Sequence, residues 1–139
     1  MHFQHHQVQY SLPDDWWNEA GISLDQLVGR SYPSGPSRWP NIPVFELAID
    51  EIQPLERAST HGVFNDNAEF GTAHERVTRI LRGFHEKAQI PPIEVARLAT
   101  DQPQRYKLID GAHRLYCSIA VGFTHVPAVE VDDIFGAYP

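Results

Sequence analysis

The sequence predicts a small domain of the α/β class, more narrowly α+β, with a mixed sheet flanked by helices. Its 139 residues, 42% of them hydrophobic, suffice for one buried core and leave little room for a second. From residue 43 onward the chain alternates in the order strand, helix, strand, strand, helix, strand. Residues 1–42, rich in His, Trp and Pro, lack that periodicity, so we divide the chain into an N-terminal extension (1–42) packed on a domain (43–139).

Within the extension, residues 13–21 predict a short helix, because a proline and two aspartates suit its start and Gly21 suits its stop. We expect Trp16, Trp17 and Trp39 to be packing anchors rather than a base-stacking platform. The histidines at positions 2, 5 and 6 have no matching Cys or carboxylate ligands. We therefore expect a disordered polar terminus there and no metal site.

The first half of the domain combines a strand, a long connection and a strong helix. Residues 44–49 predict the strand, and the polar residues 57–71 form a connection long enough for a lid or binding loop. A capping box at residues 72–75 opens a helix whose apolar residues continue to Ala88. Its basic residues are expected on the solvated side of that helix: Arg76, Arg79, Arg82 and Lys87.

The second half predicts a hairpin, a helix and a final strand. Residues 93–98 alternate as a half-buried strand, and a turn leads to 106–109 as its hairpin partner. A helix opens at Gly111 and stops at Gly122, and residues 126–131 form the last strand. The lone Cys117 is expected to be a small buried helix residue.

The junction between the strand at 106–109 and the following helix has the composition of an anion site. The first N–H groups of a helix lack partners inside it, and the helix end is partially positive, so both favour a bound phosphate. Gly111 and Ala112 lack bulk that would block a ligand, and Arg114 offers a planar fork of donors. Alternatively, Arg114 is only an ion-pair partner of Asp110, and His113 only donates to a backbone carbonyl.

Charge and composition exclude some classes of function. A net charge of −7 disfavours a protein that mainly grips nucleic acid, so nucleic acid is a less favoured partner. No apolar run approaches the roughly 20 residues of a membrane span, and no secretory signal is visible. A single cysteine agrees with a reducing compartment, so we expect a cytoplasmic protein.

Four blocks of sequence together resemble the N-terminal domain of the ParB and sulfiredoxin superfamily, over residues 43–133. They are Pro-Leu-Glu at 54–56, Ile-Pro-Pro-Ile-Glu-Val at 90–95, Leu-Ile-Asp-Gly-Ala-His-Arg-Leu at 108–115 and Gly-Phe-Thr-His-Val-Pro-Ala-Val at 122–129. The resemblance implies a stand-alone ParB-like domain that binds a nucleotide. Its phosphates would lie at Asp110, Gly111, Ala112, His113 and Arg114.

The branches of that superfamily differ at this loop. Sulfiredoxins carry a catalytic cysteine immediately before the His-Arg pair, where this chain has Ala112. Chromosome-partition proteins have Gly-Glu-Arg-Arg and a following helix-turn-helix, whereas here the loop is Gly-Ala-His-Arg. Neither activity is expected.

A third branch, similar to free-serine kinases, uses an Asp-Gly-His-x-Arg loop and a carboxylate after the first strand. Asp110, Gly111 and Arg114 match, and Ala112 departs from the pattern. The resemblance implies ATP, ADP or CTP with Mg²⁺ as ligands, Asp110 as a metal or ribose ligand and as a catalytic residue, and Glu56 as the base. Phosphoryl transfer or nucleotide hydrolysis would follow.

Two further functions stay open. The chain could be a non-catalytic module that binds a protein, a second copy of itself or DNA, with residues 57–71 and the Trp-rich extension as its surface. It could also be a metal-dependent nuclease, as the resemblance allows, which requires Glu56, Asp110, Asp132 and Asp133 to gather around a metal.

Overall fold

The computed structural model describes residues 2–22, 29–54, 73–99 and 104–132. Its elements, in chain order, are β1 (His2–His5), β2 (Val8–Ser11), α1 (Asp14–Ala20), β3 (Phe45–Ala48), the 3₁₀ helix η2 (Ile49–Glu51), α3 (Ala73–His85), β4 (Ile93–Arg97), β5 (Tyr106–Asp110), α4 (Ala112–Ala120) and β6 (His125–Glu130). The predicted α+β class and the order of elements from β3 to β6 are confirmed.

The main sheet has four strands in the order β3-β6-β4-β5. The pairs β3–β6 and β4–β5 are antiparallel, while β4 and β6 run parallel, so the sheet is mixed as predicted. The hairpin predicted for β4 and β5 is confirmed. After η2 the chain returns to the sheet, where Gln53 donates its N–H to the carbonyl of Tyr106 at 2.7 Å.

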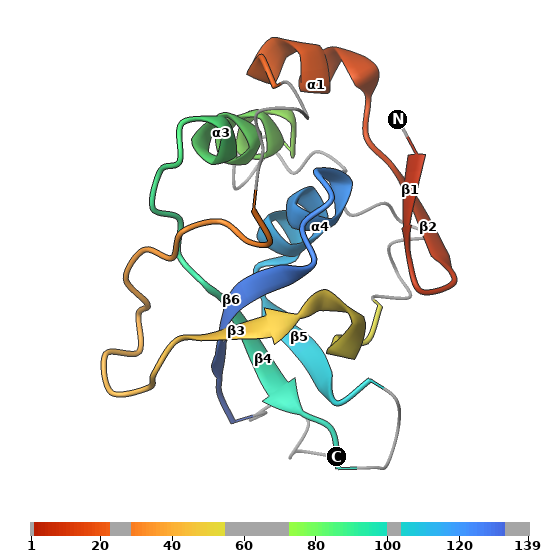
Figure 1. Ribbon diagram of the computed structural model, residues 1–139. Coiled ribbons are helices and arrows are strands. Elements are labelled where there is room, and N and C mark those ends of the chain that lie inside the picture. Colours follow the sequence, from red (N-terminus) through yellow and green to blue (C-terminus); the bar gives the residue numbers. More distant parts are fainter. Residues whose placement is uncertain (1, 23–28, 55–72, 100–103, 133–139) are drawn as a thin grey trace.

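The helices gather on one side of this sheet (Figure 1). The helix α4 packs on β4 and β6, α3 packs on α4, and α1 packs on α3. One face of α3 carries apolar residues at helical spacing and packs on the core, so Val77, Leu81 and Phe84 are buried. The helix ends at His85 and does not continue to Ala88 as predicted. Cys117 is fully buried in α4, as expected.

The N-terminal histidines lie in ordered structure, which corrects the expectation of a disordered terminus. Residues 2–11 form an antiparallel hairpin of β1 and β2. His5 is 3% exposed, and its Nε2 donates to the carbonyl of Ile49 at 3.1 Å. The Tyr10 ring packs against the Tyr116 ring of α4 with centroids 4.4 Å apart and the ring planes tilted by 47°. Aromatic packing and one buried hydrogen bond therefore order a segment that has no apolar periodicity.

The short helix predicted at residues 13–21 is confirmed as α1, and it ends at Gly21 in the left-handed conformation with φ 72°. Trp16 and Trp17 pack against the core, and the Trp16 ring stacks on His74 of α3. The expectation for Trp39 is wrong, because this side chain is 39% exposed and lies beside the Arg38 guanidinium.

Several expectations concern residues outside the described ranges: the start of the capping box at residue 72, the connection 57–71, Glu56 and Asp133. Among the residues that are described, no helix combines the length and apolarity required to cross a membrane.

We predict that acid weakens the fold partly through His5. Burial lowers the pKa of His5 below its ordinary value of 6.5. As the pH falls, the unfolded chain therefore binds a proton at this histidine before the folded chain does. The free energy of unfolding should therefore fall as the pH drops from about 7 to about 5. His5→Gln keeps a donor for Ile49 without titrating, and urea titrations at several pH values should show a shallower pH dependence. The exposed His2→Gln variant should keep the wild-type slope, and identical slopes in both variants would refute the assignment.

Candidate functional site

The predicted anion site lies where β5 ends and α4 begins. Asp110 ends the strand, Gly111 adopts φ 104°, and Ala112 starts the helix. A Cβ on Gly111 would lie 3.0 Å from Cγ2 of Ile93 and 3.1 Å from Nη2 of Arg114. The position therefore requires glycine for two reasons, its left-handed backbone and the close approach of the Arg114 guanidinium.

Arg114 connects this turn to the entry of β4. Its Nη1 donates to the carbonyls of Pro91 and Pro92 at 3.2 and 2.9 Å, and its Nη2 donates to Oδ2 of Asp110 at 3.1 Å. The side chain is only 19% exposed. The ion pair with Asp110 considered as an alternative is thus present, and Arg114 has a structural role at the turn.

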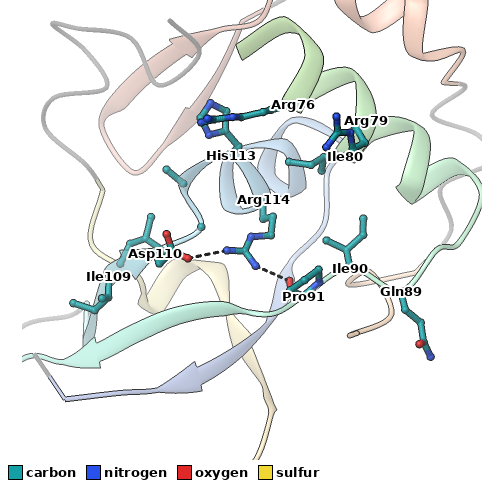
Figure 2. A pocket seen from close by; sticks show the side chains of 13 residues that line it. Arg76, Arg79, Ile80, Gln89, Ile90, Pro91, Ile109, Asp110, His113 and Arg114 are labelled. Carbon is teal, nitrogen blue, oxygen red and sulfur yellow. Dashed lines mark hydrogen bonds and ion pairs between the residues drawn. The ribbon is translucent and has the colours of Figure 1, made fainter. Parts of the chain in front are cut away.

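A cavity of about 560 Å³ opens beside the turn, between α3, the start of α4 and the end of β5. Figure 2 shows Arg76 of α3 next to His113 of α4, and Arg114 reaching toward Asp110 and Pro91. The lining residues are Arg76, Arg79, Ile80, Gln89, Ile90, Pro91, Leu108, Ile109, Asp110, Gly111, Ala112, His113 and Arg114. All five predicted phosphate-site residues therefore line one cavity, together with two arginines from α3.

Arg79, Arg82 and Lys87 are exposed, as expected for the solvated side of α3, and Arg76 is half-buried. The sequence did not predict that Arg76 and Arg79 lie at the cavity. Both line the cavity, whereas Arg82 and Lys87 do not. Residues three apart on a helix are neighbours on its surface, so the spacing of the two arginines was a usable signal. The sequence does not show which way the packed helix α3 turns the side that carries Arg76 and Arg79.

His113 is half-buried in the cavity wall. Burial, and then the charge of Arg76, lowers the pKa of His113 below its ordinary value. The imidazole is therefore neutral near pH 7. The positive charge of the cavity comes from its three arginines, opposed by the carboxylate of Asp110 alone among the residues that line it.

A second hollow of about 330 Å³ shares Pro91, Asp110 and Arg114 with the first. It also contains Glu94, whose two oxygens accept from Arg38 at 2.7 and 2.6 Å. Burial acts to raise the pKa of Glu94, but the hydrogen bonds from Arg38 and Trp39 outweigh it and hold the pKa below its ordinary value. A buried carboxylate with a perturbed pKa beside a cavity is a common feature of functional sites.

Sequence reasoning missed Glu94 because it expected β4 to be half-buried. Residues 93–96 are all buried, since β4 is a central strand with α4 on one face and the segment around Arg38 and Trp39 near the other. The usable signal was a glutamate between two core residues of a short strand.

The predicted metal and base sites stay predictions. Glu56 and Asp133 lie outside them, and within them no three His, Cys, Asp or Glu side chains gather as a metal site. Asp132 lines a hollow next to Trp39 that Asp110 does not line. Asp110 is one carboxylate beside a cationic cavity, which suits a Mg²⁺ ion carried mainly by ligand phosphates better than an ion held by protein side chains alone.

The comparisons identify no relative: no protein-family model, curated protein or solved structure matches this chain. The resemblance to the ParB and sulfiredoxin superfamily therefore stays a prediction.

We predict that Gly111→Ala destabilises the protein more than Gly122→Ala. Both glycines have positive φ, 104° and 89°, but a Cβ meets nothing within 4 Å at Gly122. Backbone strain alone should cost about 1–2 kcal/mol at Gly122, and overpacking should raise the cost at Gly111 to roughly 2–4 kcal/mol. Chemical denaturation measures both. Equal losses would show that the contact between Gly111 and Arg114 does not constrain the fold.

We also predict that Arg38→Met lowers the free energy of unfolding, because Glu94 then loses its bidentate partner. The Glu94 side chain is 7% exposed, so solvent replaces that partner poorly. The loss should shrink as the solution becomes acidic, because a protonated Glu94 no longer requires a cationic partner. The double variant Arg38→Met/Glu94→Gln should lose less at neutral pH than Arg38→Met does. A larger loss in the double variant would contradict this account.

Proposed function

We propose that the protein binds a nucleotide through its phosphates at the Asp110–Arg114 turn. One observation carries the proposal: the turn, the first turn of α4 and the two arginines of α3 all face a single cavity. Groups of one charge that converge on a cavity raise the local concentration of a counter-charged ligand. The start of α4 adds backbone donors and a favourable dipole for an anion.

The cavity also suits the rest of a nucleotide. Its volume of about 560 Å³ lies within the range of small-molecule sites. Apolar side chains form part of its lining, among them Ile80, Ile90 and Leu108. Such a surface can cover the face of a base or sugar, while the arginines hold the charged end.

The proposed ligands are ATP, ADP or CTP with Mg²⁺, used in phosphoryl transfer or hydrolysis. A bound Mg²⁺ would neutralise charge that develops on the phosphates. Asp110 is the carboxylate of the cavity and is proposed as its ligand, and Glu56 is proposed as the base that takes a hydroxyl proton. The Arg114 hydrogen bond to Oδ2 holds the Asp110 carboxylate in place at the cavity.

Isothermal titration calorimetry with ATP, ADP and CTP in Mg²⁺ tests the proposal. At least one nucleotide should bind, and Arg114→Ala should weaken it at least about tenfold, because the turn loses the side chain that positions it. Thermal unfolding of the variant separates lost binding from lost folding. If none of the three nucleotides binds the wild-type protein, or if Arg114→Ala binds as tightly, the proposed function is wrong.

A further inference from the structure

We propose that the N-terminal hairpin of β1 and β2 is a latch, which is closed on the domain at neutral pH and opens in mild acid while the four-stranded sheet stays folded. The latch is independent of the proposed function. Its opening is a local event that involves one segment, and it is distinct from the global unfolding whose pH dependence His5 also affects.

Two consecutive histidines attach the hairpin to two consecutive carbonyls of η2. His5 Nε2 donates to the carbonyl of Ile49 at 3.1 Å, and His6 Nε2 donates to the carbonyl of Asp50 at 2.9 Å. The other contacts of β1 with the domain are with α4. Because an isolated two-stranded hairpin is only marginally stable in water, the hairpin should lose its structure once these contacts are broken.

The backbone of the hairpin turn is strained at His6. This residue lies between β1 and β2 with φ 55°, a left-handed conformation that favours glycine. A larger residue stays in that conformation only where surrounding contacts hold it. The hydrogen bond from His6 to the carbonyl of Asp50 is such a contact, and it exists only while the hairpin is docked. The closed latch therefore stores strain that opening releases.

His5 is the group through which acid can open the latch. Its side chain is buried, and its Nδ1 has no hydrogen-bond partner among the described residues. Since Nε2 carries the proton that is donated to Ile49, a second proton must bind at Nδ1. That proton would place a charge and an unpaired N–H group in the interior, and both cost free energy. Water solvates both in the open hairpin, so protonation favours opening.

The groups around His5 do not compensate a positive charge on its ring. In β2, Val8 lies opposite it in the ladder, and α4 contributes the uncharged ring of Tyr116 with centroids 6.0 Å apart. Burial lowers the pKa of His5, and it outweighs the hydrogen bond to η2, which acts to raise that pKa. A charged His6 in the same turn lowers the pKa further, while the carboxylate of Asp50 in η2 acts to raise it.

Hydrogen exchange of backbone amides in the intact protein tests the latch. NMR follows the exchange at about pH 7.5 and about pH 5.5, with and without low concentrations of urea, and each rate is corrected for the intrinsic effect of pH. Amides of β1 and β2 should be at least about tenfold less protected than those of β4. Low urea should hardly change their exchange, because a local opening exposes little surface. Their protection should fall several-fold, up to about tenfold, between the two pH values, which is the limit for a histidine of ordinary pKa in the open state.

Three histidine variants identify the trigger. His5→Gln keeps a donor for Ile49 without titrating, so the protection of β1 and β2 should change less than about twofold between the two pH values. His2→Gln is the matched control, because His2 is exposed on the same strand, and it should keep the wild-type dependence. His6→Ala removes the hydrogen bond to Asp50, so the hairpin should lose protection about threefold or more at both pH values.

Two outcomes would overturn the latch. If wild-type amides of β1 and β2 share the protection and the urea dependence of β4, the hairpin does not open separately from the sheet. If the hairpin opens separately but its protection has the same pH dependence in His5→Gln as in the wild-type protein, His5 does not trigger the opening. Amides of β4 in the same sample give each variant an internal reference, which separates local opening from a general loss of stability.

Discussion

The hydrogen bonds of one guanidinium hold together the two segments from which the candidate site is built. Arg114 donates to the carbonyls of Pro91 and Pro92, just before β4, and to Asp110, at the end of β5. Those carbonyls precede a strand that pairs on both sides, where a lost donor is costly. Gly111 lets the guanidinium approach the turn, since any Cβ there would crowd it. Position 111 therefore favours glycine as long as Arg114 keeps this conformation.

The opposite wall of the cavity depends on packing rather than on hydrogen bonds. Val77, Leu81 and Phe84 fix the rotation of α3 against the core, and that rotation places Arg76 and Arg79 at the cavity. The helix α1 holds α3 from its far side through a hydrogen bond between Glu19 and His74 and the stacking of Trp16 on His74. The N-terminal part of the chain thus influences the geometry of a cavity that it does not line.

The local sequence pattern was sufficient to predict the helices and strands of the domain and the turn at Asp110–Arg114. Apolar periodicity placed α3 and the strands, and a glycine between a strand and a helix placed the Asp110–Arg114 turn. The local pattern could not predict contacts between residues that are distant in the sequence. Arg38 pairs with Glu94 across 56 positions, and His5 donates to the carbonyl of Ile49 across 44 positions. Neither contact has a periodic signature, since each depends on how loops cross a finished core. The same limit explains why the sequence did not predict that Arg76 and Arg79 line a cavity.

A cationic cavity on an acidic chain has a physical consequence for selectivity. With a net charge of −7, the molecule as a whole repels a long polyanion. Screening confines that repulsion and the attraction of the cavity to about 8 Å at physiological salt. A small phosphate ligand in the cavity would lie close to the arginines, while a long polyanion would also meet the net negative charge of the rest of the molecule. If the proposed function holds, this charge distribution should favour compact phosphates over a long polyanion.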